Sequence, residues 1–216
     1  KNTPPGQTFW FGSDELGRDM FTKTALGGRI SLSIAFLATL IKAILGIFFA
    51  SLAVYKGKRM DFWLLRFFDV LQSIPYLLLA MFLTFLFTPG FFTILFAMTL
   101  TGWIPIARIV RSQLLYLQKE EYVLAAKAIG ASSFRILFYH LLPNAMGPIL
   151  ASILLSVPTS LFTEAFLSFL GLGIQAPSAS WGALLNDAVG AIAYYPWRFF
   201  FPAFFFCWHP AVSVAL

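Results

Sequence analysis

The chain has 216 residues, of which 59% are hydrophobic, 18% are aromatic and only 11% are charged. Soluble domains carry about 25% charged and about 45–50% apolar residues, so this composition excludes an ordinary soluble domain and indicates a membrane protein. The single cysteine, Cys207, excludes a disulfide framework and a multi-cysteine metal site, and the formal charge of +6 reports membrane topology rather than nucleic-acid binding.

The N-terminal segment, residues 1–29, is polar and rich in turn residues. It has neither an initiating methionine nor an apolar signal core, so it does not match a signal peptide. From composition alone, a disordered tail is as well supported as an ordered segment. The run FGSDELGRDMFTKTALGGRISL, residues 11–32, resembles the segment that follows the first transmembrane helix in ABC importer permeases of the oligopeptide, dipeptide and nickel type. The resemblance implies an external segment, and it implies that the family's first membrane helix is missing from this chain.

Five apolar runs predict membrane-spanning helices. They cover residues 30–55, 70–87, 91–110, 145–172 and 199–216. Apolar runs of about 17–25 residues are long enough to cross a bilayer as helices. The predicted fold class is therefore an all-α, polytopic transmembrane helical bundle of about five spans, occupying residues 30–216.

Basic residues predict the orientation of the spans. Residues 56–66 carry four Lys or Arg side chains against a single Asp, which is typical of a cytoplasmic loop. Alternation then places residues 1–29, 88–90 and 174–198 outside and residues 108–140 inside. The predicted location is a bacterial-type inner membrane, which the chain crosses several times.

The end of the chain departs from the family pattern. From about Cys207 onward the resemblance fails, and His209 and Pro210 interrupt the last predicted span. We interpret this end as truncated or misread, and we assign His209 no ligand role.

Polar and helix-breaking residues fall inside the predicted spans. Lys42 indicates either a contact within the bundle or a pathway residue, and the first is favoured because importers of the resembled type are driven by ATP and need no charge relay. For Glu164, structural hydrogen bonding and lining of the substrate path are equally supported interpretations. For the glycine- and proline-containing break at residues 101–105, a structural kink and a pathway element are equally supported interpretations. The candidate translocation-path residues are Pro75, Gly102, Trp103, Pro105 and Glu164.

A polar, helix-forming stretch over residues 120–148 stands apart from the apolar spans. Its Ala, Leu and Lys residues predict a short helix over residues 122–129, and Gly130 predicts a turn. A second helix over residues 134–142 is predicted to stop before Pro143. The stretch therefore predicts a compact helix–glycine–helix element outside the bilayer. From composition alone, an ordinary amphipathic loop between two spans is the alternative.

Small and turn-forming residues in this stretch recur at the spacing of the EAA signature of binding-protein-dependent ABC importer permeases. They are Ala125, Ala126, Gly130, Leu142 and Pro143. The acidic residue of the signature falls on Leu124 here, and the Ile that usually precedes Leu-Pro falls on His140. The resemblance implies that the loop of residues 111–143 docks in a cleft of a cytoplasmic ATPase. The ATPase-coupling residues that it implies are Glu121, Ala125, Ala126, Gly130, Arg135, Leu142 and Pro143.

No catalytic motif occurs in the sequence. It lacks a GxxxxGK[ST] phosphate loop, an HExxH or GxSxG motif and a paired-carboxylate constellation, and it predicts neither a metal site nor a cofactor. The chain is therefore interpreted as a non-catalytic transport subunit that relies on ATP hydrolysis by a separate partner.

The preferred function is a permease subunit of an ATP-driven importer of oligopeptides or dipeptides that forms half of the translocation pathway. A nickel-chelate importer of the same family is the alternative. A secondary transporter is less favoured because it predicts paired intramembrane ionisable residues, and only Lys42 and Glu164 occur. The partners that the resemblance implies are a second permease subunit in a heterodimer, two cytoplasmic ATP-binding subunits and an external solute-binding protein, all at a lipid bilayer and without nucleic acid.

Overall fold

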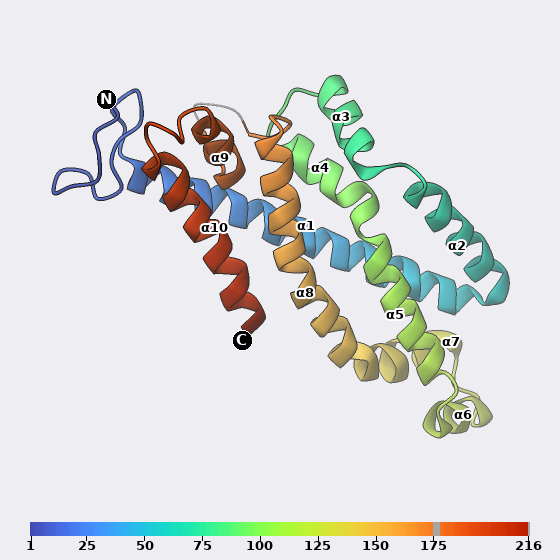
Figure 1. The fold of residues 1–216 in the computed structure, drawn as a ribbon. Coiled ribbons are helices and arrows are strands. Elements are labelled where there is room, and N and C mark those ends of the chain that lie inside the picture. The colour runs from blue at the N-terminus through green and yellow to red at the C-terminus, as the bar shows by residue number, and fades with distance from the viewer. Residues whose placement is uncertain (175–177, 216) are drawn as a thin grey trace. The chain divides into compact units, whose positions relative to one another are not determined.

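The structure is a computed structural model that describes residues 1–174 and 178–215, with the side chains of residues 209–215 outside the description. Residues 175–177 of the predicted external segment, and the side chain of His209, therefore lie outside the described residues. Within these ranges the chain is helical and contains no strand (Figure 1). The helices are α1 (Met20–Lys56), α2 (Lys58–Gln72), α3 (Tyr76–Leu86), α4 (Phe91–Gly102), α5 (Ile104–Leu117), α6 (Glu121–Ala128), α7 (Ser133–Arg135), the π-helix η1 (Ile136–Leu141), α8 (Leu142–Phe169), α9 (Trp181–Val189) and α10 (Trp197–Ala215).

The helices form two compact units. Unit 1 comprises Lys1–Ala38, Leu77–Met98 and Val157–Leu216, and unit 2 comprises Thr39–Tyr76 and Thr99–Ser156. The helices α1, α3, α4 and α8 each contribute residues to both units. Each unit is described by itself below.

An apolar core surrounds Trp181, at the start of α9, in unit 1. Ala35 of α1, Leu161 of α8 and Leu184 of α9 are buried with it. The indole Nε1 atom of Trp181 donates a hydrogen bond to the Thr24 carbonyl oxygen at 2.9 Å. Helix α9 also packs against α10. This core holds α9 in place, so the segment of residues 174–198, which was predicted to be external, contains a packed helix.

The N-terminal segment of unit 1 is folded around the buried carboxylate of Asp14. The Oδ1 atom of this residue accepts hydrogen bonds from the backbone N–H groups of Leu16 at 2.9 Å and Arg18 at 2.8 Å. Its Oδ2 atom accepts from Arg18 Nε at 2.7 Å and from Lys23 Nζ at 3.0 Å. The segment is therefore an ordered element rather than a disordered tail.

The Asp14 carboxylate predicts an acid-sensitive contribution to stability. Burial by itself raises its pKa, but hydrogen bonds from the Arg18 backbone and from the Lys23 and Arg18 side chains outweigh burial and lower the pKa from 3.8 to about 2. A lowered pKa stabilises the folded state above the unfolded-state value, here by about 2 kcal/mol, and this contribution is lost as the pH falls from about 4 towards 2. Thermal unfolding of the wild type and Asp14→Asn between pH 2 and 7 measures this difference.

The matched control for this prediction is Glu15→Gln at the neighbouring, largely exposed position, whose only ion pair is a 3.9 Å contact with Arg198 among the described residues. We expect Asp14→Asn to lower the melting temperature at pH 7 and to match the wild type near pH 2, and we expect Glu15→Gln to have little effect at either pH. Equal melting temperatures for Asp14→Asn and the wild type at pH 7 would contradict the assignment.

Three helical stretches of the described chain are long and apolar enough to cross a membrane. They are Met20–Lys56, Phe91–Leu117 and Ser133–Phe169, and the broken pair of α2 and α3 makes a fourth if it counts as one span. The fifth predicted span falls on α10, whose last side chains lie outside the described part of the chain. The observed number thus agrees roughly with the predicted five, although α1 begins ten residues before the predicted start at residue 30.

Residues 56–66 in unit 2 are mostly helical, and the expectation of a loop there is wrong because most of them belong to α2. An apolar stripe explains this helix: Phe68 is fully buried, and Leu64, Leu65 and Leu71 pack into the same cluster at helical spacing. The charged side chains of α2 lie on its remaining surface. The helix is broken near Pro75, since α2 ends at Gln72 and α3 begins at Tyr76.

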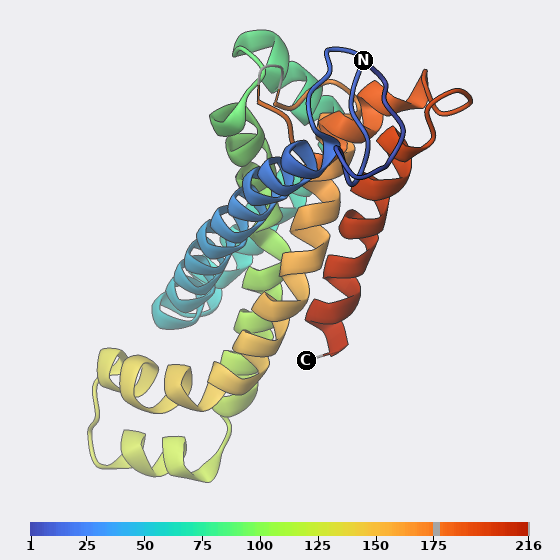
Figure 2. The ribbon, with the colours of Figure 1, turned by 90° about the vertical axis from the view of Figure 1, so that its left-hand side faces the viewer.

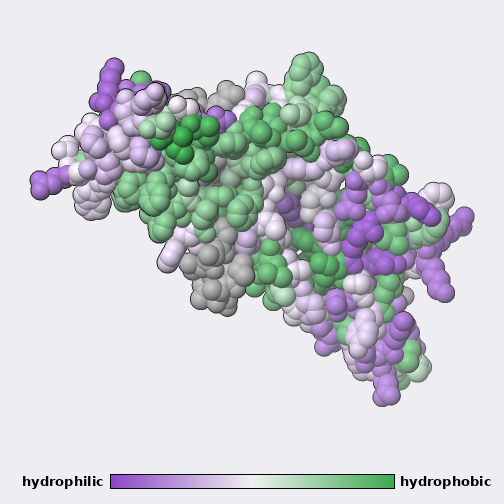
Figure 3. Space-filling view, in the orientation of Figure 1, coloured by the Kyte–Doolittle hydropathy of each residue, from purple (hydrophilic) through white to green (hydrophobic). Residues whose placement is uncertain are grey.

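Unit 2 has its largest core where α1, α5, α6, η1 and α8 meet. The buried members of this core are Ala50, Val54, Ile106, Val110, Leu114, Val123, Ile136, Leu137, Leu141, Ala145 and Ile149. Figure 3 shows hydrophilic residues gathered over α6 and over the N-terminal end of α2, both in unit 2. The core therefore anchors a polar end of unit 2 to the predicted spans.

Candidate functional site

The predicted coupling helix is present as α6, one residue earlier than expected at each end. Its N-cap residue Glu120 has extended backbone, and Glu121 places a negative charge in the first turn, where the helix dipole favours it. Val123 and Ala126 are buried against the core, whereas Ala125 is exposed. The two alanines therefore differ in exposure: Ala126 is buried, and Ala125 forms part of the outer surface.

The turn after α6 is a Schellman motif centred on Gly130. The N–H of Ala131 donates to the Ala126 carbonyl and the N–H of Gly130 donates to the Lys127 carbonyl, both at 3.0 Å. This motif requires a left-handed residue, and Gly130 has φ of 85°. The side chain of Ser132 then caps the next helix by accepting a hydrogen bond from the Arg135 N–H at 3.3 Å. The predicted glycine elbow is thus built from backbone hydrogen bonds.

The second helix of this element does not stop before Pro143, so that expectation is wrong. The chain is helical without a break from Ser133 through α7, η1 and α8. A π-turn accommodates the proline: the Leu142 N–H donates to the Leu137 carbonyl, five residues earlier, and Pro143 then falls in the first turn of α8, where its missing N–H is tolerated. Figure 2 shows α6 alongside the start of this long helix.

The structure brings most of the predicted coupling residues to one end of unit 2. Those that are exposed are Glu121, Ala125, Gly130, Arg135 and Pro143, while Leu142 is half-buried and Ala126 is buried. Large apolar side chains are also exposed on this element and were not among the predicted coupling residues. They are Leu124, Ile129, Phe134, Phe138 and Tyr139. Ile129, which directly precedes the glycine, is the most exposed of them, at 87%.

The break between α4 and α5 lies in unit 2 and is packed rather than open. Trp103 is buried, its ring is stacked on Phe49 at a centroid distance of 4.4 Å, and it meets Phe68 edge-on at 5.2 Å. The stem of the buried Lys42 covers Gly102, where an added Cβ would lie 2.6 Å from Lys42 Cε. These contacts favour a structural role for Gly102 and Trp103, and a place for either in the translocation path stays a prediction, as it does for the exposed Pro75 and Pro105.

Glu164 of α8 is fully buried in unit 1. Its Oε1 atom accepts a hydrogen bond from Ser168 Oγ at 2.7 Å, and the hydroxyl groups of Ser31 and Ser180 also approach the carboxyl group. Its Oε2 atom has no hydrogen-bond partner in the part of the chain that the structure describes. Serines from α1, α8 and the start of α9 thus converge on one carboxyl group. This geometry favours the structural reading of Glu164, and lining of the substrate path stays a prediction.

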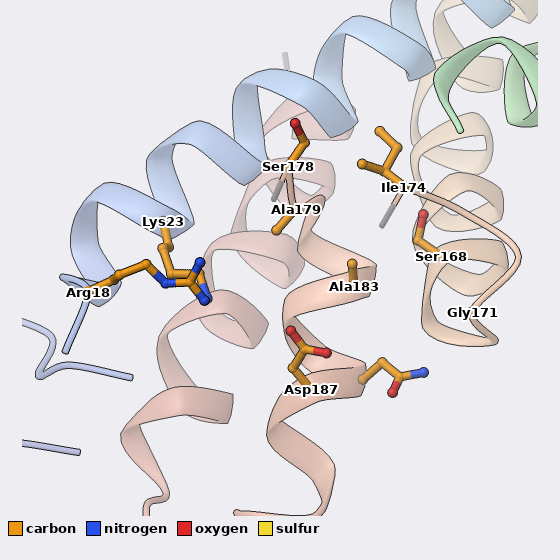
Figure 4. A pocket seen from close by; sticks show the side chains of 10 residues that line it. Arg18, Lys23, Ser168, Gly171, Ile174, Ser178, Ala179, Ala183 and Asp187 are labelled. Carbon is orange, nitrogen blue, oxygen red and sulfur yellow. The ribbon is translucent and has the colours of Figure 1, made fainter. Parts of the chain in front are cut away.

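A polar cavity of about 270 Å³ lies next to this serine cluster in unit 1. Its lining includes Arg18 and Lys23 from the start of the chain, Ser168 of α8 and Asp187 of α9. Figure 4 shows the charged ends of Arg18 and Lys23 beside each other. Both cations already bind the Asp14 carboxylate. Among the described residues, no group of three or more His, Cys, Asp or Glu side chains is placed to hold a metal ion.

The family model described as "Binding-protein-dependent transport system inner membrane component" matches residues 42–208. The chain is 50% identical over 204 residues to the oligopeptide transport system permease protein OppC of Bacillus subtilis (strain 168). This match covers 94% of this chain and 67% of that protein. It is 51% identical over 206 residues to the dipeptide transport system permease protein DppC of the same organism. That match covers 95% of this chain and 64% of that protein. The chain thus spans about two thirds of the length of these curated relatives.

Solved structures share the fold. A structure of the MetNI methionine ABC transporter in inward-facing conformations matches with a TM-score of 0.76 at 17% identity, covering 90% of this chain and 92% of that one. A structure of an amino acid ABC transporter with histidines matches with a TM-score of 0.70, also at 17% identity, covering 90% of this chain and 91% of that one. These likenesses confirm the predicted helical, membrane-spanning fold class.

Proposed function

Because the chain belongs to the family of binding-protein-dependent transport system inner membrane components, we propose that it is a permease subunit of an ATP-driven importer of oligopeptides or dipeptides. It forms half of the translocation pathway in the inner membrane, with a second permease subunit as the other half. A separate pair of cytoplasmic ATPases hydrolyses ATP, and an external binding protein delivers the solute. The names of the relatives confirm the expected class, a transport permease rather than an enzyme.

The observation that carries the coupling part of this proposal is the exposed element of α6, Gly130 and α7. It is short, capped by backbone hydrogen bonds and anchored on a buried core, and its outer surface combines small, charged and large apolar side chains. Such a surface supplies an apolar contact area with a polar rim, which protein interfaces commonly use. In the proposal it docks in a cleft of the ATPase and passes nucleotide-driven motion to the spans.

Purification and transport assays test the two parts of this proposal separately. The chain, tagged and expressed with the genes that neighbour its own, is expected to co-purify with an ATP-hydrolysing partner, whereas a secondary transporter would purify without one. Cells carrying the whole system are expected to accumulate a labelled dipeptide but not chelated nickel. Accumulation of nickel alone would move the assignment to the nickel branch of the family, and accumulation without any ATPase would overturn ATP-driven import.

A further inference from the structure

Two ion pairs fasten α2 to α5 within unit 2. The guanidinium of Arg111 donates from Nε and Nη2 to the two carboxylate oxygens of Asp61, which is the bidentate geometry that arginine uses for strong pairs. Nη2 of Arg108 donates to Asp69 Oδ1 at 2.7 Å and to Gln72 Oε1 at 3.2 Å. The pair between Asp61 and Arg111 is sheltered, with side chains 20% and 22% exposed.

The order of the pairs fixes how the two helices lie. Asp61 precedes Asp69 by about two turns of α2, whereas its partner Arg111 follows Arg108 along α5. The helices are therefore antiparallel, and the charge pairs lie at the margin of an apolar contact. Phe68 of α2 is buried in this contact with Trp103, Ile104 and Ala107.

Helix α5 is in turn fixed to α6. A hydrogen-bonded turn joins them, because the N–H groups of Gln118, Lys119 and Glu120 donate to carbonyl groups of the last turn of α5, each at 3.1 Å. Leu114 of α5 and Val123 of α6 are fully buried in the same core. A displacement of α6 is therefore carried to α5 without a flexible joint between them.

We propose that α2 is a second member of the coupling element, held to α5 by the Asp61–Arg111 and Asp69–Arg108 pairs so that it moves together with α6. This inference rests on the proposed coupling function and adds to it a positioning role for Asp61 and Arg111. Neither residue lies in the signature that implied the coupling loop. Coupling between two sites requires an element that keeps its shape in both states, and the ion pairs between α2 and α5, with the turn and shared core between α5 and α6, give the three helices that property.

Exchange of the two charges tests the inference in the complete transporter. Asp61→Arg and Arg111→Asp each place like charges opposite one another, and we expect each to lower nucleotide-driven uptake by about tenfold or more at unchanged membrane abundance. The double exchange restores an ion pair in reversed orientation, and we expect it to return uptake to within about threefold of the wild type. If the double exchange is as defective as the single variants, the positioning role is overturned.

The matched control is Arg66→Glu, which reverses a charge on the same helix. The Arg66 side chain is 65% exposed, and its nearest acidic partner, Asp69, lies at 4.0 Å. Exposed ion pairs of this kind contribute little to stability, so uptake by the Arg66→Glu variant is expected to stay within about twofold of the wild type. A loss as large as that of Asp61→Arg would show that the overall charge of α2, rather than the pair, sets the effect.

A spin-label distance gives a readout that loss of fold would not produce. Labels at positions 58 and 127, in a Cys207→Ser background, report the separation of α2 from α6; both positions are exposed. We expect one narrow distance distribution that is unchanged when nucleotide is trapped, and a broadened one in Asp61→Asn. A wild-type distance that changes on nucleotide trapping contradicts movement as one body.

The same labels in the isolated chain separate this inference from the proposed function. If no ATPase couples to the chain, no ATPase co-purifies with it and uptake does not depend on ATP, so the proposed function fails. The isolated chain still tests whether the ion pairs clamp α2 to α5. The label-to-label distance distribution is expected to broaden in each single charge-reversal variant and to narrow again in the double exchange. A narrow distribution in both single variants overturns the clamp whatever the transporter carries.

Discussion

Cells whose transporter carries Gly130→Val are expected to lose about tenfold or more of their dipeptide uptake while the protein reaches the membrane in normal amount. The Schellman turn after α6 requires φ of 85° at this position. A residue with a side chain costs about 1–2 kcal/mol in the left-handed region, and a β-branched residue more, so the ratio of the elbow to competing conformations falls by a factor of about 5–30 or more. Uptake of labelled dipeptide, normalised to membrane abundance, measures the effect.

The control for this prediction separates backbone conformation from added volume. No atom lies within 4 Å of the position that a Cβ would occupy at Gly130, so a side chain there meets no neighbour in the chain. Asn adopts left-handed backbone far more readily than Val, and Gly130→Asn is therefore expected to keep most of the uptake. Wild-type uptake by Gly130→Val would show that the elbow angle does not matter, and equal loss in both variants would point to the docking surface instead.

Gly182→Ala is expected to destabilise the folded chain by about 3 kcal/mol, the largest stability effect predicted for a single methyl group. Gly182 lies in α9 where that helix crosses α8 in unit 1. An added Cβ would lie 2.7 Å from Ala165 Cα and still closer to the Ala165 carbonyl oxygen. Both obstacles are backbone atoms, so α9 has to move away from α8 and disturb the core around Trp181. Thermal unfolding in detergent is expected to show a melting temperature lower by about 6–12 °C.

Gly190 provides the matched comparison at the other end of α9. It has ordinary helical backbone, with φ of −68°, and no atom lies within 4 Å of its Cβ position. Gly190→Ala is therefore expected to leave stability unchanged or to raise it by up to about 1 kcal/mol through the unfolded state. A melting temperature for Gly182→Ala equal to that of Gly190→Ala would contradict the close approach of α8 and α9.

The parts of the site that depend on local residue chemistry could be predicted from the sequence. Helix α6 and the turn at Gly130 are found within one residue of their expected places, because helix propensity and a glycine requirement act over a few neighbouring residues. The long apolar runs predicted the spans for the same reason. Pro143 was misjudged because proline stops a helix only when its missing N–H and its ring cannot be accommodated, and the π-turn at residues 136–141 accommodates both.

The parts that depend on distant residues could not be predicted in this way. The basic residues of 56–66 were interpreted as a loop, although the spacing of Leu64, Phe68 and Leu71 already matches one face of a helix. Even that pattern does not reveal that Asp61 pairs with Arg111, fifty residues later. The environment of Glu164 is of the same kind, since two of the three serines around it come from other helices or their caps.

The π-helix η1 has a consequence for how this region can vary in length. A π-turn holds one residue more than an α-turn over the same rise, so the six residues of η1 carry a spare position in the helical register. Deleting one residue there would convert the turn to ordinary α-helix and leave every later side chain of α8 on its present face. A deletion a few residues further on would instead rotate that face by about 100° and expose Glu164. Length variation among relatives should therefore be tolerated at η1 and rejected beyond it.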